Sequence, residues 1–266
     1  MNWRDEIASW RREPVYFYIG ASVVVSVFFW LVFFVGETGL IRFGHLWQYF
    51  ALPAGLSEFV RRPWTLATYP FIHLNLVVFI INILLLHFIG TQLQILEHNE
   101  RLFRLSIAGI IAGALGFWSA YYGIPAWFKD EQATYLTGVS VVHTAWLGYA
   151  GMRYGDYPLN MRLFGRWKWR WLLWLFLVWD LVQLPLVNTG GHAAHLAAMT
   201  AGILYAWILQ KRRSKRGKFN VYDNYKTAGE KQIDRILDKI NRHGLDSLTD
   251  EEREILYRES KRKNKL

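Results

Sequence analysis

Long apolar runs follow one another along residues 15–210, and polar or charged residues separate each run from the next. A helix needs about 20 mainly apolar residues to cross a bilayer, and these runs approach or reach that length. We therefore predict an all-α membrane protein in which six spanning helices form one bundle. The predicted spans are 15–36, 71–92, 102–122, 136–152, 171–187 and 192–209.

The pattern changes after residue 210, where charged residues replace the apolar runs. Ile233, Ile236, Leu237 and Ile240 recur at helical spacing, and Thr249 with Glu252 forms a capping-box signature before a further helix. These features predict a small helical hairpin. The predicted organisation is a short N-terminal segment (1–14), a six-helix membrane domain (15–210), and a basic juxtamembrane segment with a helical tail (211–266).

Composition agrees with a membrane protein and narrows its chemistry. The chain is 53% hydrophobic and 17% aromatic, yet it carries a formal net charge of +10. It contains no cysteine, which excludes disulfides, thiolate catalysis and cysteine-ligated metals. The basic run from Lys211 to Lys218 beside a predicted span fits anionic lipid better than nucleic acid. We expect the lipid bilayer as a partner and no nucleic acid.

Basic residues also predict the orientation. With the N-terminus inside, and counting as far as Lys218, sixteen lysines and arginines fall in internal segments and only four fall outside. Since basic residues concentrate on the cytoplasmic side, both termini are predicted to be cytoplasmic. The external four are Arg42, Arg61, Arg62 and Lys129.

Two polar side chains stand at matching external depths in this topology, Ser140 on the fourth span and His195 on the sixth. Ionisable groups inside a membrane are functional candidates by default. Small residues recur at every fourth position beside each of them, and such stripes let helix backbones approach closely. The stripes are Ser140, Thr144 and Gly148 on the fourth span, and Ala194, Ala198 and Gly202 on the sixth. We predict that they pack together and bring Ser140, a candidate nucleophile, to His195, a candidate base.

Asn82 on the second span is the next candidate. It lies about 13 Å of helical rise beyond His73, at roughly the depth of Ser140, where its amide could donate a hydrogen bond to an oxyanion. The alternative is that Asn82 only joins helices by hydrogen bonding, which is the commoner use of asparagine in a bundle.

Other ionisable residues compete for the role of the base. His143 lies one turn after Ser140, and His192 lies one turn before His195. We rank both below His195. An i, i+3 neighbour such as His143 aligns poorly on the Ser140 hydroxyl, because both are held to one helix backbone. Asp180 is expected to be a structural carboxyl, about 13 Å of helical rise from the external end of its helix. No metal site is predicted, since neither a cysteine nor a nearby carboxylate completes a tetrahedral set with His192 and His195.

The order of motifs resembles the rhomboid family of intramembrane serine proteases. The resemblance rests on Arg62 to Leu66, Tyr69 to His73, Asn82, then Gly138-Val139-Ser140, and finally Ala194-His195-Leu196 with Gly202. It implies a Ser140/His195 dyad rather than a triad, without a cofactor, that cleaves transmembrane segments of other membrane proteins. It also implies an oxyanion site made by the Ser140 amide and Asn82, a half-embedded loop over residues 37–68, and lateral substrate entry between the second and fifth spans.

Several positions depart from the family pattern. Val78 stands where a histidine commonly precedes the asparagine, so one oxyanion donor is expected to be missing. Val141 stands where glycine often follows the nucleophile, and its side chain is expected to crowd the oxyanion pocket. Thr144 replaces an aromatic residue that often stacks on the catalytic histidine, and Ala198 replaces a glycine.

The tail resembles that of a bacterial branch of the family, which implies the bacterial inner membrane as the location. Two other functions stay open on the sequence. A proteolytically inactive rhomboid-like protein would bind client transmembrane helices without cleaving them. A transporter or channel is disfavoured because the chain shows no second half with matching broken helices.

Overall fold

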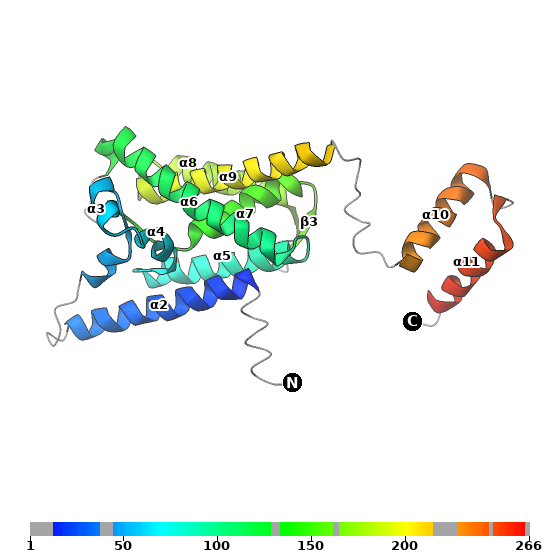
Figure 1. Cartoon of the computed structure of the whole chain (residues 1–266), viewed down its shortest axis with the longest axis horizontal. Coiled ribbons are helices and arrows are strands. Elements are labelled where there is room, and N and C mark those ends of the chain that lie inside the picture. The colour runs from blue at the N-terminus through cyan, green and yellow to red at the C-terminus, as the bar shows by residue number, and fades with distance from the viewer. Residues whose placement is uncertain are drawn as a thin grey trace. The chain divides into compact units, whose positions relative to one another are not determined.

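The computed structural model describes residues 13–37, 45–128, 134–161, 165–214, 228–244 and 247–263. The chain divides into two compact units, residues 1–210 and 211–266 (Figure 1). Most of the predicted N-terminal segment lies outside the described residues, as do Arg42, Lys129 and Lys215 to Lys218.

Each predicted span coincides with a helix of the first unit. Four of these helices, α2, α5, α6 and α9, are long and apolar enough to cross a membrane, so the prediction is confirmed for them. Helices α7 and α8 have only 14 and 15 residues, and their crossing of the membrane stays a prediction. The bounds are α2 Pro14–Glu37, α5 Leu76–Gln94, α6 Asn99–Gly123, α7 Ser140–Arg153, α8 Trp169–Gln183 and α9 Thr189–Ser214.

Shorter elements join the long helices. Two antiparallel two-stranded ribbons form, one pairing Leu52 with Leu136 and Pro53 with Tyr135, the other pairing Pro158 to Met161 with Lys168 to Gly165. The sequence patterns did not predict these ribbons. The short elements are η1 Leu46–Tyr49, β1 Leu52–Pro53, α3 Leu56–Arg61, α4 Thr65–Thr68, η2 Tyr69–Phe71, η3 Pro125–Trp127, β2 Tyr135–Leu136, β3 Pro158–Met161 and β4 Gly165–Lys168.

At three boundaries the predicted span extends beyond the end of the helix, each time for a local reason. Helix α5 begins at Leu76 because the side chain of Asn75 caps it, accepting hydrogen bonds from the amides of Val77 and Val78. Helix α7 begins at Ser140, after Gly138 with φ of 104°. Helix α8 ends at Gln183, since Leu184 precedes Pro185 and a residue before proline is disfavoured in a helix.

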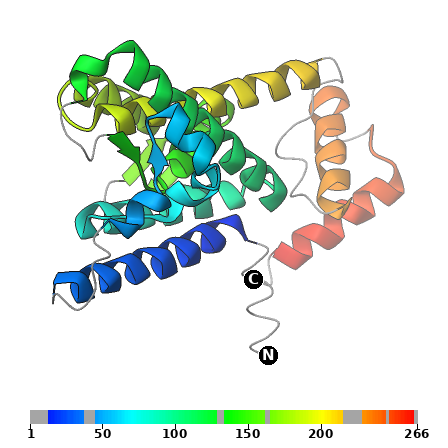
Figure 2. The same cartoon turned by 60° about the vertical axis from the view of Figure 1, so that its left-hand side comes forward.

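Helix α7 lies at the centre of the first unit. It packs against α5, α6 and α8, and every residue from Ser140 to Gly151 is buried. Figures 1 and 2 show the longer helices arranged around it, with α2 beside α5 at one edge. The first residue of α7, Ser140, is therefore held inside the bundle by packing on several sides.

Glycines set how closely α7 approaches α9. A Cβ atom placed at Gly202 would lie 2.1 Å from the carbonyl oxygen of Ala145, and one at Gly148 would lie 2.1 Å from that of Met199. Ala194 and Ala198 are fully buried along the same side of α9. The prediction that the two small-residue stripes pack together is confirmed at these contacts.

Gly202→Ala is therefore expected to push α9 away from α7. The new Cβ would meet backbone atoms, the carbonyl of Ala145 and the amide nitrogen of Tyr149 at 2.8 Å, which cannot rotate away as a side chain can. We expect a loss of about 1–3 kcal/mol, the usual range for an overpacked core, measured by thermal unfolding in detergent. Gly20→Ala is the matched control, since nothing lies within 4 Å of its Cβ position. Equal melting temperatures for both variants would contradict this packing.

Arg62 stabilises the segment before α5 through several contacts. Its Nη1 donates to the carbonyl of Gln48 at 2.9 Å, its guanidinium lies 5.0 Å from the ring centroid of Tyr49, and it forms an ion pair with Glu58. Trp64 Nε1 also donates to the carbonyl of Tyr49 at 2.8 Å. These contacts join η1 to the turn after α3.

Within residues 228–244 and 247–263, the described part of the tail, the second unit forms the helices α10 Ala228–His243 and α11 Asp250–Lys263. The predicted capping box is confirmed: the amide of Thr249 donates to Glu252 Oε2 at 2.9 Å, and the amide of Glu252 donates to Thr249 Oγ1 at 3.3 Å. Lys239 of α10 donates to the same Glu252 oxygen at 2.7 Å, so this carboxylate joins the two helices.

The hydrogen bond from Lys239 lowers the pKa of Glu252, and the capping amide of Thr249 adds to this. A carboxyl whose folded pKa is depressed stabilises the fold above its unfolded pKa, about 4.3 for glutamate, and loses that contribution as the pH falls through the folded value. When the pH is lowered to less than about 4, we expect the backbone amides at the start of α11 to lose protection against hydrogen exchange, measured on the full chain. In Glu252→Gln this pH dependence should be absent, and a wild-type profile there would contradict the assignment.

Candidate active site

A cavity of about 640 Å³ opens beside the first residue of α7. It brings together Ser140, His195, Asn82, His73 and Gly138, which are predicted to lie on three separate spans. These residues therefore share one cavity, while their common depth in a membrane stays a prediction. The remaining lining residues are Trp47, Leu74, Asn75, Val78, Tyr135, Thr137, Val187, Asn188 and Gly191.

Ser140 is positioned by the loop that precedes it. Gly138 has φ of 104°, a left-handed conformation that glycine adopts without strain, and its amide donates to the carbonyl of Tyr69 at 3.0 Å. Ser140 is then the first residue of α7 and is 8% exposed. Because the first amides of a helix have no carbonyl partner within it, the Ser140 amide is available to an anion at the helix start.

His73 fixes the same loop from the opposite side. The amide of Val139 donates to His73 Nε2 at 3.3 Å, so this nitrogen is the acceptor and Nδ1 carries the ring proton. Nδ1 lies 3.1 Å from Ser26 Oγ, which in turn donates to the carbonyl of Phe71 at 3.2 Å. His73 therefore connects α2 to the loop before Ser140, and both of its ring nitrogens are used in doing so.

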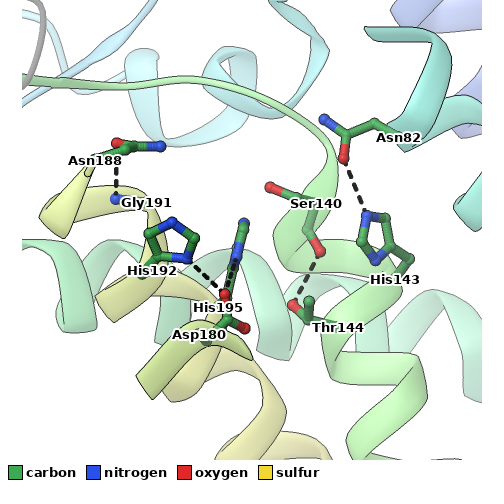
Figure 3. Close-up of polar contacts among 9 residues, drawn as sticks. All are labelled: Asn82, Ser140, His143, Thr144, Asp180, Asn188, Gly191, His192 and His195. Atoms are coloured by element: carbon green, nitrogen blue, oxygen red, sulfur yellow. Dashed lines mark hydrogen bonds and ion pairs between the residues drawn. The ribbon is translucent and has the colours of Figure 1, made fainter. Parts of the chain in front are cut away.

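Asn82 is oriented by His143. The ring Nε2 of His143 lies 3.2 Å from Asn82 Oδ1 (Figure 3), so the Asn82 amide oxygen faces the His143 ring and its Nδ2 points away from that ring. A Cβ atom placed on Gly138 would lie 3.7 Å from Asn82 Nδ2 and 3.8 Å from Ser140 Oγ. The absent Gly138 side chain thus leaves space between the amide and the hydroxyl.

Val141 does not crowd this space, so that expectation was wrong. It is not among the residues that line the cavity. Its Cγ1 instead lies over Gly113 of α6, 2.7 Å from where a Cβ atom would be. Val141 faces α6, where the absence of a side chain at Gly113 leaves room for it.

Thr144 donates to the carbonyl of Ser140 at 2.9 Å, within the first turn of α7.

His195 contacts Asp180, which the sequence analysis had placed far from the site. The His195 Nδ1 and Asp180 Oδ1 atoms are 3.0 Å apart, and His192 Nδ1 lies 2.7 Å from the same oxygen (Figure 3). The prediction failed because it continued α8 to residue 187. The helix ends at Gln183, so Asp180 lies one turn from its end, beside the start of α9.

The cluster of Asp180, His192 and His195 also has metal-ligand chemistry, with one atom from each within 4.8 Å of the others. The expectation that no carboxylate lies near the two histidines was therefore wrong. Distances of 2.7 and 3.0 Å are those of direct hydrogen bonds. The contacts seen are explained without a metal.

Comparison with protein families identifies the class. A family model described as the rhomboid domain matches residues 60–212, and one described as a family of unknown function (DUF6576) matches residues 220–262. A comparison with curated proteins gave no match. The chain belongs to the rhomboid family. With four helices long and apolar enough to span, it is a multi-pass membrane protein.

Proposed function

We propose that the protein is an intramembrane serine endopeptidase that cleaves transmembrane segments of other membrane proteins. One observation carries the proposal: in a chain of the rhomboid family, Ser140, His195 and Asn82 line one cavity inside the helical bundle. The hydroxyl supplies a nucleophile, the imidazole a base, and the amide a donor for developing negative charge.

In the first step, Ser140 Oγ attacks the carbonyl carbon of the scissile peptide bond. The Oγ–H proton passes to His195 Nε2 as the new C–O bond forms, and the carbonyl π electrons move onto oxygen. His195 Nδ1 faces Asp180, so Nε2 is the ring nitrogen on the far side from that carboxylate (Figure 3). This leaves Nε2 as the nitrogen that can serve the cavity.

The oxyanion would be held by the Ser140 amide and Asn82 Nδ2. Support comes from the space beside Gly138, which lies within 4 Å of both the Asn82 amide and the Ser140 hydroxyl. His143 compensates for the histidine that Val78 replaces, acting through Asn82 rather than directly, because it fixes which end of the amide faces the cavity.

Breakdown of the tetrahedral intermediate completes the acylation. The C–N bond breaks, and the imidazolium proton of His195 passes from Nε2 to the leaving amine nitrogen. Water then attacks the acyl-enzyme ester, His195 takes the water proton, and Ser140 Oγ leaves with that proton. The cavity volume of about 640 Å³ is large enough to admit both water and a segment of substrate backbone.

The membrane placement is part of the proposal. Helices α7 and α8 complete a six-helix bundle, both termini lie in the cytoplasm of a bacterial cell, and residues 37–68 form a half-embedded loop at the outer face. The charge distribution supports this orientation. Substrate would enter between α5 and α8, since Val78 of α5 and Val187, in the turn that follows α8, line the cavity and are 52% and 63% exposed.

The test is cleavage in lipid. Wild-type protein is reconstituted with a panel of tagged single-span substrates whose spans contain helix-destabilising small residues, and the products are identified by mass. We expect cleavage within or at the edge of the span. Intact substrate that co-purifies with the protein across the panel would contradict the proposal and indicate a non-proteolytic protein that binds client helices.

A further inference from the structure

Asp180 is the one carboxylate in contact with the proposed base, among the residues that the structure describes. Its side chain is 3% exposed, and a single oxygen, Oδ1, faces the Nδ1 atoms of both His195 and His192. The other oxygen, Oδ2, is buried without a hydrogen-bond partner among the described residues. A buried carboxylate is costly unless hydrogen bonds satisfy it, so these two histidine contacts are what hold it there.

The arrangement is fixed by local backbone structure. Helix α8 ends at Gln183, before Pro185, and Asn188 has φ of 48°. Asn188 Oδ1 then accepts from the amide of Gly191 at 3.2 Å, which caps the start of α9. This tight connection sets the first turn of α9, with His192 and His195, against the last turn of α8.

The chemistry of the contacts decides the tautomer of His195. An ionised carboxylate only accepts hydrogen bonds, so each histidine must donate Nδ1–H to Oδ1. A neutral imidazole with its proton on Nδ1 has its lone pair on Nε2. His195 lines the cavity with Ser140, and Nε2 is the nitrogen not used by Asp180. A general base for a hydroxyl needs this form of the ring.

We propose that Asp180 is a positioning residue, which holds His195 as the Nδ1-protonated tautomer with Nε2 available to Ser140. The inference rests on the proposed protease function and replaces its dyad with an Asp180–His195–Ser140 series. Asp180 forms no bond to substrate and gives up no proton. It orients the ring before attack and stabilises the imidazolium that forms, as His192 donates the second hydrogen bond to Oδ1.

The kinetic test compares Asp180→Asn with wild type in proteoliposomes. We expect kcat to fall about 10- to 100-fold, the effect of losing one charge-assisted hydrogen bond, with KM unchanged within about twofold because Asp180 does not line the cavity. Asp180→Glu should recover part of kcat. Asp156→Asn is the matched control, since that carboxylate is 68% exposed and, among the described residues, pairs with Lys168 and Arg170 outside the cavity.

The second readout needs no activity. Nitrogen-15 NMR of histidine-labelled Ser140→Ala protein in lipid distinguishes a protonated ring nitrogen from an unprotonated one, and a His195→Gln variant assigns the signals. Samples contain a chelator, because Asp180, His192 and His195 could also bind a transition metal. We expect His195 with its proton on Nδ1, and loss of this preference in Asp180→Asn.

The two readouts separate the inference from the function on which it rests. Wild-type cleavage with an unchanged kcat in folded Asp180→Asn, or His195 with its proton on Nε2, would overturn the positioning role. If wild-type protein cleaves nothing, the protease proposal fails, and the tautomer still decides whether Asp180 holds His195 as inferred.

Discussion

Replacing Ser140 by alanine is expected to lower kcat for peptide cleavage by about 10⁴-fold or more, and His195→Ala should cost about as much. Ser140 Oγ forms the acyl-enzyme, and without His195 its proton has no acceptor in the cavity. Because the two groups act as one unit, the double variant should be no slower than either single variant. The measurement is initial cleavage rate in proteoliposomes at saturating substrate.

Two variants serve as matched controls for these substitutions. Thr200→Ala removes an exposed hydroxyl of α9 that donates to the carbonyl of Leu196, and His87→Ala removes an exposed histidine of α5. Neither residue lines the cavity, so both variants should cleave at the wild-type rate. Residual cleavage within tenfold of wild type in Ser140→Ala would show that another residue is the nucleophile.

Asn82→Ala is expected to lower kcat by about 10²- to 10³-fold, the usual cost of removing one oxyanion donor. The loss should fall on kcat rather than KM, since the Asn82 amide would contact the oxygen mainly once it carries charge. The melting temperature of the variant, measured on the same samples as the cleavage rates, shows whether its helices pack as in wild type.

The contact between His143 and Asn82 gives a second prediction about the same amide. His143→Phe removes the ring nitrogen that faces Asn82 Oδ1. The Asn82 side-chain amide can then rotate so that Oδ1 and Nδ2 exchange places. We expect a smaller loss than in Asn82→Ala, and almost no further loss when His143→Phe is added to Asn82→Ala. Additive losses in the double variant would mean that His143 does not act through Asn82.

The helices and the convergence of the site were predictable because they depend on local signals. Apolar runs long enough to cross a bilayer place the helices of the first unit, and the small residues at Gly148 and Gly202 indicate where two backbones meet. That Ser140, Asn82 and His195 would meet at one cavity could be predicted because the rise per residue is constant along a helix.

The contacts of individual side chains were less predictable. Helix α7 is buried on all sides, so its sequence has no polar face from which its rotation could be deduced. Val141 therefore could have faced the cavity or α6, and His143 could have faced Ser140 or Asn82; packing with α5 and α6 decides both.

Asp180 was misplaced for a reason that the sequence does contain. Pro185 ends α8 near Gln183. A helix predicted to end before this proline places Asp180 in its last turn, close to the start of α9. The choice of both His192 and His195 as partners still required the geometry of the turn at Asn188, which has φ of 48°.

The central claim is that Ser140 is an activated nucleophile inside the bundle, and a covalent adduct tests it most directly. Wild-type protein in lipid is treated with a serine-directed fluorophosphonate, and the modified peptide is located by mass spectrometry. The account predicts one phosphonyl adduct on Ser140 that is absent in Ser140→Ala and strongly reduced in His195→Ala. Wild-type protein that stays unmodified, or an adduct on a different residue, would contradict it.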